Sequence, residues 1–264
     1  MKKPLLHVMF ASEKRKEVLL LLQNGPKDME YLLKSLDTSR QALLPQIRIL
    51  EDHYLITNER DTCILTHLGK LIVDDIALAL KNIDVFSNNI EYWGSHDLHF
   101  IPPHLLKRIN ELESCTSVTV QISEIFDEDE TFVEEAKRTK FICTVTSFMF
   151  PHFEKLFTEM TELNVNASFI VSDDLYQKLL HEKSEDLQYI SQNPNIELYR
   201  YPSNFPFTSF TLTDHAVMLR TFTLEGGYDT KRIICSSEDA LKWGKELYEY
   251  YLKDSILITE IEHQ

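Results

Sequence analysis

Three short helical patterns followed by two short strands, all within the first 65 residues, constrain this fold more than any other feature of the sequence. Each helical pattern repeats apolar side chains three or four positions apart, and the two strands flank a polar tip. Capping and stop residues separate the elements, with Ser39 before the third helix and Asn24-Gly25-Pro26 after the first. This order predicts a winged helix-turn-helix. Its elements are expected at residues 12–24, 27–36, 39–53, 54–56 and 63–65.

The third helix is the part of such a domain that reads DNA, because the major groove accepts one helix and its side chains reach base edges. The sequence from Thr38 to Ile56 resembles the recognition helix and wing entry of ArsR-like winged-helix regulators. Leu-Glu at 50–51 and Leu-Ile at 55–56 carry the resemblance. It implies DNA contacts from Ser39, Arg40, Gln41, Gln46, Arg48 and Arg60, with Lys14, Arg15 and Lys34 as further phosphate contacts.

Pro45 departs from this pattern, because it lies among the apolar positions Leu43, Ile47 and Leu50 of the third helix. A proline there removes an amide and presses against the carbonyl of Gln41. We therefore expect a kink, or a helix that begins later than Ser39, and either would change which side chains contact bases.

The acidic residues are concentrated in the later part of the chain, whose net charge is −15. Residues 1–85 hold 12 Lys+Arg and 12 Asp+Glu (12 − 12 = 0), and residues 86–264 hold 15 and 30 (15 − 30 = −15). Such an asymmetry indicates that the two parts meet different partners. A neutral segment can still bind phosphates when its cations share one face, and the acidic remainder would be repelled by DNA.

A long apolar stripe connects the two parts of the chain. It begins at Thr66 and continues to Ile90, which is long for a helix that only completes a winged domain. In ArsR-like regulators the last helix commonly forms the dimer contact, so the resemblance implies a homodimer. The alternative is that the stripe packs inside one chain. Gly94-Ser95-His96-Asp97 marks a boundary. We expect a DNA-binding domain at 1–85, a connection at 86–97 and a second domain at 98–264.

Residues 98–264 alternate between short β-rich runs and helical stretches, which include an expected helix at 128–138. Strand–helix alternation predicts parallel strands in the first half, and a later run of strands adds antiparallel ones. The predicted fold is therefore α/β with a mixed sheet, in three layers, behind an N-terminal winged helix-turn-helix.

The final segment, with Thr213-Asp214-His215, Gly226-Gly227 and a helix carrying Trp243-Gly244, resembles the archaeal two-domain regulators of methanogens. These pair an ArsR-like domain with an effector domain, and related archaeal regulators have an effector domain akin to phospholipase D enzymes. Phospholipase D chemistry needs a His with a Lys two residues on, but Val217 occupies that position after His215. Glycine-rich nucleotide loops and the common hydrolase motifs are also missing. We therefore expect no enzyme activity.

Small molecules bind open α/β sheets beyond the carboxyl ends of parallel strands. Those ends carry hydroxyl and carboxylate groups beside aromatic side chains, which suits an effector pocket. The expected anchors are Ser147, Phe148, Ser172, Asp173 and Tyr201. The acidic run at 127–130 could attract a divalent cation, although it is better explained as a solvated helix start.

The four cysteines, Cys63, Cys115, Cys143 and Cys235, are widely spaced and are expected to be isolated reduced thiols. No cofactor or metal is implied, and we find neither an apolar run long enough to span a membrane nor a signal peptide. We expect a cytoplasmic regulator that binds operator DNA as a dimer and responds to a small-molecule effector. The alternatives are a winged-helix interaction module that does not bind DNA, and a phospholipase D-like phosphodiesterase.

Overall fold

The computed structural model describes residues 4–121, 138–149 and 153–259. The chain divides into two compact units, Met1–Lys81 and Asn82–Gln264, with the division inside helix α5 (His67–Asn88). The predicted helix at 128–138 and the acidic run at 127–130 lie outside the described residues, except for Arg138. Among the helices that the structure describes, none is both long and apolar enough to cross a membrane.

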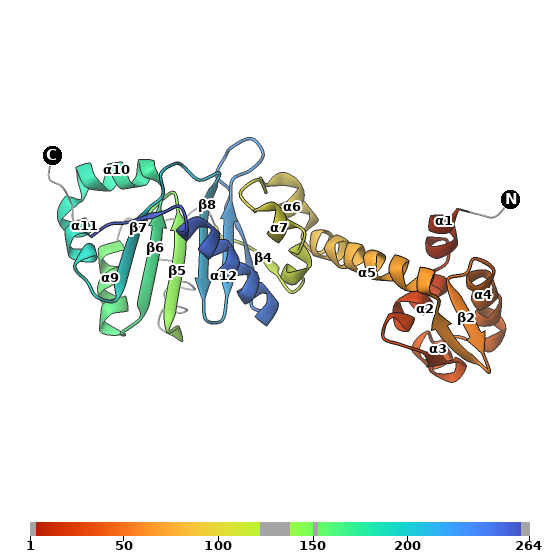
Figure 1. Cartoon of the computed structure of the whole chain (residues 1–264). Helices are drawn as coiled ribbons and strands as arrows, with labels where there is room; N and C mark the ends of the chain where they lie inside the picture. The colour runs from red at the N-terminus through yellow and green to blue at the C-terminus, as the bar shows by residue number, and fades with distance from the viewer. Residues whose placement is uncertain (1–3, 122–137, 150–152, 260–264) are drawn as a thin grey trace. The chain divides into compact units, whose positions relative to one another are not determined.

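The first unit contains the helices and the strand pair that the sequence predicts (Figure 1). Their apolar sides meet in one core, where Leu43, Ile47 and Leu50 of the third predicted helix are fully buried. A short strand before α3 adds a third strand, so the antiparallel order is β1-β3-β2. The elements are α1 (Leu5–Phe10), α2 (Glu13–Gln23), β1 (Lys27–Asp28), α3 (Met29–Ser35), α4 (Arg40–Asp52), β2 (Ile56–Glu59) and β3 (Thr62–Leu65).

The hairpin turn is tighter than the sequence predicts. Only Arg60 and Asp61 separate the paired residues Glu59 and Thr62, and both have positive φ values, 51° and 64°. Two consecutive left-handed residues are the geometry of a type I′ turn, whose twist matches that of the strands. We call Arg60-Asp61 the hairpin tip.

The second unit is built on an eight-stranded mixed sheet of order β11-β7-β6-β5-β8-β9-β10-β4. Strands β5, β6 and β7 are parallel, and the remaining pairs are antiparallel, as the predicted mixed sheet requires. The strands are β4 (Thr116–Thr119), β5 (Phe141–Thr146), β6 (Asn166–Val171), β7 (Ile196–Arg200), β8 (Phe207–Thr213), β9 (Val217–Thr221), β10 (Lys231–Cys235) and β11 (Ile256–Leu257).

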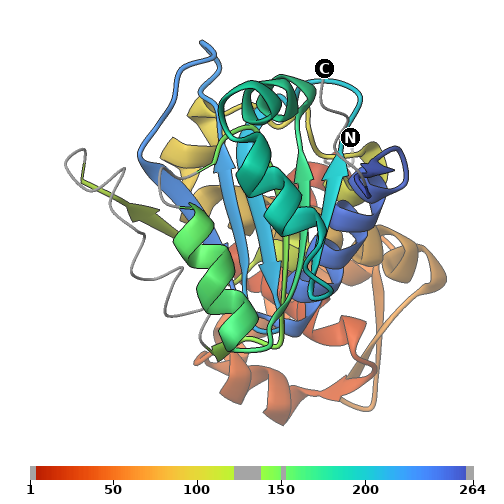
Figure 2. The same cartoon turned by 90° about the vertical axis from the view of Figure 1, so that its left-hand side faces the viewer.

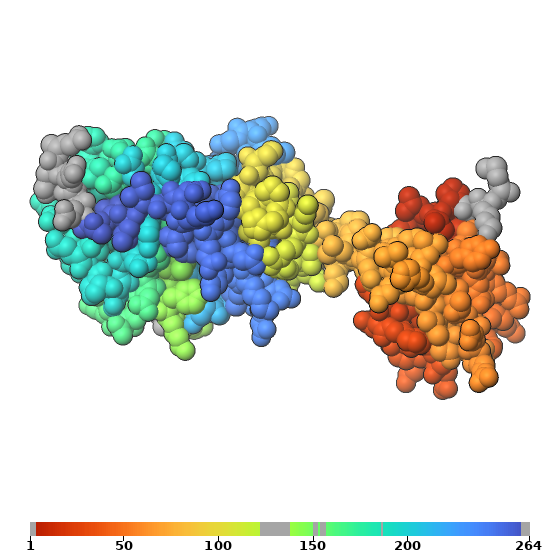
Figure 3. All heavy atoms as spheres, in the orientation of Figure 1, coloured from red at the N-terminus to blue at the C-terminus, as the bar shows by residue number. Residues whose placement is uncertain are grey.

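Helices cover both faces of this sheet, which gives three layers (Figure 2). On one face α12 packs with α6, α7 and the 3₁₀ helix η1, and these segments lie side by side in Figure 3. On the other face α9, α10 and α11 cover β5, β6 and β7. The helices are α6 (Ile90–Ser95), α7 (Pro103–Leu106), η1 (Ile109–Leu112), α9 (Phe153–Glu162), α10 (Asp173–Glu182), α11 (Ser184–Ser191) and α12 (Glu238–Leu252).

Residues 86–97, which the sequence separates as a connection, pack within the second unit. The hydroxyl of Tyr92 lies 2.8 Å from Oγ1 of Thr221, and the amide of Asp97 donates to the carbonyl of Phe222. His96 is buried and stacks on the ring of Tyr92. These contacts fix the segment against β9 and the turn that follows it.

The expectation of four reduced cysteines is wrong for two of them. Cys115 and Cys235 form a disulfide, while Cys63 and Cys143 are free. The register pairs Ile234 with Thr116, so the next residue outward on each strand is a cysteine. Their Cα atoms are 4.3 Å apart, as expected for directly opposite residues without mutual hydrogen bonds. A separation of 120 residues along the chain hides this pairing from any spacing rule.

Candidate nucleic-acid interface and ligand pocket

Helix α4 presents one continuous exposed row of side chains, which we call the outer ridge: Gln41, Pro45, Arg48 and Asp52. These positions are spaced by three or four residues and lie opposite the buried side of the helix. The side chain of Ser39 caps the helix by accepting from the amide of Ala42. No acidic residue lies in the first turn, so the positive end of the helix dipole is not neutralised there.

The hairpin tip lies beside the start of α4. The guanidinium of Arg40 is 2.6 Å from Oδ1 of Asp61, and both side chains are about half exposed. The hydrogen bond to the carboxylate of Asp61 raises the pKa of Arg40. This ion pair joins two predicted contact regions, the helix start and the wing, and leaves Arg60 exposed next to it. Lys34, on α3, is also exposed.

The structure gives some of the predicted contact residues a different role. Arg15 is buried, and its guanidinium donates to the carbonyl of Val8 and, at 2.9 Å, to Oε1 of Gln46. The ammonium of Lys14 donates to Oγ1 of Thr38 at 2.7 Å. Arg15 therefore supports the base of α4 from inside, and we remove it from the contact set. Sequence spacing missed this because Arg15 lies on the core side of α2.

Of the two outcomes expected for Pro45, a delayed start is not seen, because α4 begins at Arg40 directly after its cap Ser39 and continues through Pro45 to Asp52, whereas a kink stays a prediction. Pro45 lies on the outer ridge, as does Gln41, whose carbonyl loses the amide that would normally bond to it. Water can reach this exposed side of the helix and satisfy the carbonyl. The proline is tolerated because it faces outward.

The five residues expected to anchor an effector do not form one site. Ser147 donates to the carbonyl of Phe207, buried Ser172 caps α10, and Asp173 pairs with Arg200 at 2.5 Å. Phe148 lines one pocket and Tyr201 lines another, of about 180 Å³ beside Tyr250 and Tyr251. The polar side chains at the carboxyl ends of β5 and β6 therefore mainly bond to neighbouring parts of the second unit.

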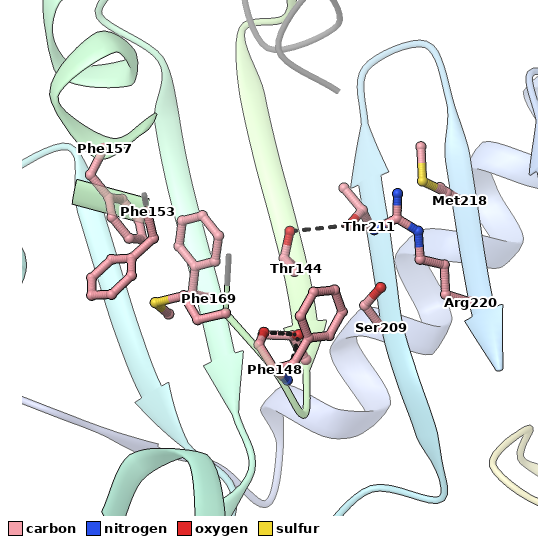
Figure 4. A pocket seen from close by; sticks show the side chains of 11 residues that line it. Thr144, Phe148, Phe153, Phe157, Phe169, Ser209, Thr211, Met218 and Arg220 are labelled. Carbon is pink, nitrogen blue, oxygen red and sulfur yellow. Dashed lines mark hydrogen bonds between the residues drawn. The ribbon is translucent and has the colours of Figure 1, made fainter. Parts of the chain in front are cut away.

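Phe148 belongs to a pocket of about 40 Å³ over the face of β5, β8 and β9 (Figure 4). Its floor carries hydroxyl groups from neighbouring strands, and Oγ1 of Thr144 and Oγ1 of Thr211 lie 3.3 Å apart. Arg220 extends from β9 beside Thr211. Its burial lowers the pKa of the guanidinium below the usual value. The full lining is Thr144, Thr146, Phe148, Met149, Phe153, Phe157, Phe169, Ser209, Thr211, Met218 and Arg220.

Sequence reasoning missed most of this pocket, because it named only Phe148 among the lining residues. The available signal was the strict alternation in β8, where Ser209 and Thr211 alternate with apolar Phe210 and Leu212. Such alternation usually marks a solvent-facing side. Here both hydroxyl residues are buried, so the polar side of the strand lines a pocket. In the part of the chain that the structure describes, no cluster of His, Cys, Asp or Glu could hold a metal ion.

Two parts of this chain match two domains of one protein family. The N-terminal domain of the methanogenesis regulatory protein FilR1 matches residues 3–84, and the middle domain of the same protein matches residues 125–254. A curated relative, methanogenesis regulatory protein FilR1 of Methanothrix harundinacea (strain 6Ac), is 26% identical over 260 residues, or 96% of this chain. The chain spans 58% of the length of that relative.

Solved structures give weaker similarities. The archaeal chromatin protein TrmBL2, described with a novel mode of DNA binding, is 13% identical with a TM-score of 0.43, covering 92% of this chain and 93% of its own. The phospholipase D family member Nuc from Salmonella typhimurium is also 13% identical, with a TM-score of 0.41, covering 54% of this chain and 97% of its own. Both TM-scores are too low to establish a shared fold.

Proposed function

This chain belongs to the FilR1 family of methanogenesis regulatory proteins, and we propose that it regulates transcription by binding double-stranded DNA through a winged helix-turn-helix. The observation that carries the proposal is the outer ridge of α4. Its four side chains are exposed, and the start of the helix lies next to the hairpin tip. The helix is preceded by a short turn after α3 and followed by a two-stranded hairpin, the arrangement of a winged domain.

Direct contacts to DNA are assigned to the exposed members of the predicted set. Gln41 and Arg48 lie on the outer ridge, where amide and guanidinium groups can bond to base edges in the major groove. Ser39 and Arg40 lie at the positive end of the helix, which favours a phosphate. Arg60 on the hairpin tip suits the neighbouring backbone. Lys34, which is exposed, is a secondary phosphate contact in this proposal, as are the half-buried Lys14 and Gln46.

A homodimer fits this function, because two winged domains can read the two halves of a palindromic site. Exposed apolar side chains on α5, Leu68, Leu71 and Leu78, support a contact between two copies. The second unit is proposed to act in the cytoplasm as the domain that responds to a small molecule. A ligand can shift the regulator only if it binds one arrangement of the dimer more tightly than another.

The test is recovery and titration of DNA. Genomic fragments are selected with the purified full chain, and the affinity for a selected fragment is measured by gel shift at several salt concentrations. Binding through phosphates should weaken steeply as salt rises. Arg48→Ala should weaken specific binding by about 1–3 kcal/mol. Lys70→Ala, which removes an exposed cation from α5, is the control and should leave the affinity unchanged.

The competing function is a winged-helix interaction module that does not touch DNA. Failure to recover any fragment in dilute buffer, or an affinity that does not respond to salt, would favour that alternative and end the regulator proposal.

A further inference from the structure

The larger of the two pockets described above, of about 180 Å³, lies at the carboxyl end of the parallel strand β7. Tyr201 directly follows that strand, and its amide donates to the carbonyl of Val171 at the end of β6. Asn204, which also lines the pocket, accepts from the amide of Asp174 and donates to its carboxylate. Open α/β sheets bind small molecules at this edge. The loop that borders the pocket is therefore held in place by the sheet itself.

Aromatic rings from two parts of the second unit line the pocket. Tyr201 and Phe205 lie between β7 and β8, whereas Tyr250 and Tyr251 lie near the end of α12. The ring centroids of Tyr201 and Tyr251 are 5.5 Å apart, and the rings of Tyr250 and Tyr251 stand at 87° to each other. The hydroxyl of Tyr251 donates to the carbonyl of Phe100 at 2.7 Å, which fixes α12 against a third side of the pocket. The rings are thus held by contacts within the unit.

The surroundings of the pocket are negatively charged. The described residues that line it include no lysine or arginine. Nδ1 of His99 lies 2.5 Å from Oδ1 of Asp97, so a carboxylate balances any charge on this histidine. Burial and, after it, the negative charge of Asp254 raise the pKa of Tyr201, which keeps the phenol neutral. Residues 86–264 have an excess of acidic side chains (15 − 30 = −15). Such a field attracts cations and repels anions.

The arginine next to Tyr201 in the chain does not bring a positive charge to the pocket. The guanidinium of Arg200 is 2.5 Å from Oδ1 of Asp173, and it lies 5.2 Å from the ring centre of Tyr176 on α10. Helix α10 covers the face of the sheet opposite to α12. The charge of Arg200 is therefore balanced on the other face.

The size of the pocket suits one compact organic ion. An apolar cavity of about 150 Å³ binds benzene, which has six heavy atoms, so about 180 Å³ accommodates roughly seven. The faces of aromatic rings are negative and attract cations, and quaternary ammonium groups are the ions that clusters of such rings recognise. We propose that this pocket binds a small quaternary ammonium cation against the rings of Tyr201, Phe205 and Tyr250. That this cation is the effector rests on the proposed regulatory function, whereas its binding does not.

Calorimetric titration of the full chain with tetramethylammonium tests the proposal, with tert-butanol as a neutral molecule that also has about five heavy atoms. The cation should bind with a Kd of about 1 mM or tighter, and about tenfold more tightly than tert-butanol. Phosphocholine carries the quaternary head next to a phosphate, as a lipid head group does. It should bind more weakly than tetramethylammonium, because the carboxylate of Asp254 repels the phosphate.

Three variants test the contribution of an aromatic ring. Tyr250 is 44% exposed, so Tyr250→Leu removes the ring without opening the core, and it should weaken binding of the cation by about three- to tenfold. Tyr250→Phe keeps the ring and should bind like the wild type. Tyr189→Leu removes a tyrosine of α11 that is 53% exposed and does not line the pocket. As the matched control, it should leave the affinity unchanged.

Equal affinity for tetramethylammonium and tert-butanol, no binding of the cation, or unchanged affinity of a folded Tyr250→Leu variant would overturn the proposal. Tighter binding of phosphocholine would do so as well, and would point to a phosphate ester. Should Tyr250→Leu fail to fold by circular dichroism, Asp254→Asn decides, because it removes a nearby charge at an exposed position; full affinity there counts against the site. All titrations are done without DNA, so failure of cation binding is distinguishable from failure of DNA binding in the gel shift.

Discussion

Arg15, which the sequence predicts to contact DNA, is buried and stabilises the first unit instead. Its guanidinium bonds to the carbonyl of Val8 and to Gln46, and so links α1, α2 and α4. A buried guanidinium is tolerated only when its donors are used. This one therefore holds the base of α4, while Arg40 and Arg48 remain at the surface.

The cysteines allow a direct chemical test at the same scale. Protein purified without reductant and then unfolded should show two reactive thiols, and four after reduction, because Cys115 and Cys235 are joined. In the folded protein the two free thiols should react slowly at neutral pH. Burial raises the pKa of both Cys63 and Cys143 to about 11, which leaves little thiolate. Four thiols in the unreduced chain would contradict the disulfide.

Gly69 is required where the first turn of α5 crosses the segment before β2. A Cβ atom there would lie 1.9 Å from the carbonyl oxygen of Leu55, and backbone cannot move aside cheaply. Gly69→Ala should therefore destabilise the first unit by about 1–3 kcal/mol. Gly94→Ala is the matched control, because nothing lies within 4 Å of a Cβ at that helical position. Alanine there should be neutral or stabilising.

Denaturant unfolding separates the two glycine variants. Both tryptophans, Trp93 and Trp243, belong to the second unit, so their fluorescence reports on that unit alone. Gly69→Ala should shift part of the circular dichroism transition to lower denaturant while the fluorescence transition stays in place. An unshifted dichroism transition would show that α5 and Leu55 are not in close contact.

At the scale of elements, α4 combines a well-buried inner side with an outer ridge interrupted by proline. The apolar inner side stabilises the helix, and Pro45 removes one backbone hydrogen bond where solvent can replace it. Stability and recognition are therefore separated onto opposite sides of the same helix. This separation makes the outer ridge suitable for contact with another molecule.

Replacing the proline should strengthen the helix. In Pro45→Ala the new amide can donate to the carbonyl of Gln41, and alanine has a higher helix propensity. The unfolded chain also becomes more flexible, which offsets part of this gain. We expect the first unit to become more stable by about 1–2 kcal/mol, seen in the dichroism transition with tryptophan fluorescence unchanged. Loss of stability would mean that the ring of Pro45 makes packing contacts that this structure does not explain.

At the scale of the whole molecule, the charge distribution separates two tasks. The cations proposed to contact DNA lie in the neutral first 85 residues, and both pockets lie in the acidic remainder. The negative charge of the acidic part disfavours contact between that part and DNA phosphates.

Self-association through α5 can be tested by one substitution. Leu71 is 61% exposed, so Leu71→Glu should hardly change the stability of a single chain. In a dimer formed through this helix it would bury a charge, and the protein should shift toward monomer in sedimentation analysis. Lys70→Glu places the same carboxylate one residue earlier as a control. Identical association of wild type and Leu71→Glu would exclude this part of α5 from the interface.

Local pattern determined much of the architecture. The apolar spacing of Leu43, Ile47 and Leu50 located α4 to within a residue at each end. The apolar runs at 54–56 and 63–65 predicted the hairpin, but β2 begins only at Ile56 and extends into the predicted polar tip. The same reasoning gave the mixed sheet, because strand–helix alternation requires parallel strands. Local patterns work here because helix and strand periodicity depends on near neighbours in the chain.

Only the tertiary structure decided which residues meet across long separations. In the folded chain Cys115 is bonded to Cys235, and Arg15 is buried. Thr144, Ser209 and Arg220 line one pocket, whereas the five residues expected to anchor an effector lie apart. Strand order and register bring these groups together, and a sequence constrains register only through the packing of the whole sheet. The sequence therefore determined the elements and their inner faces, and the tertiary structure decided what the remaining side chains can do.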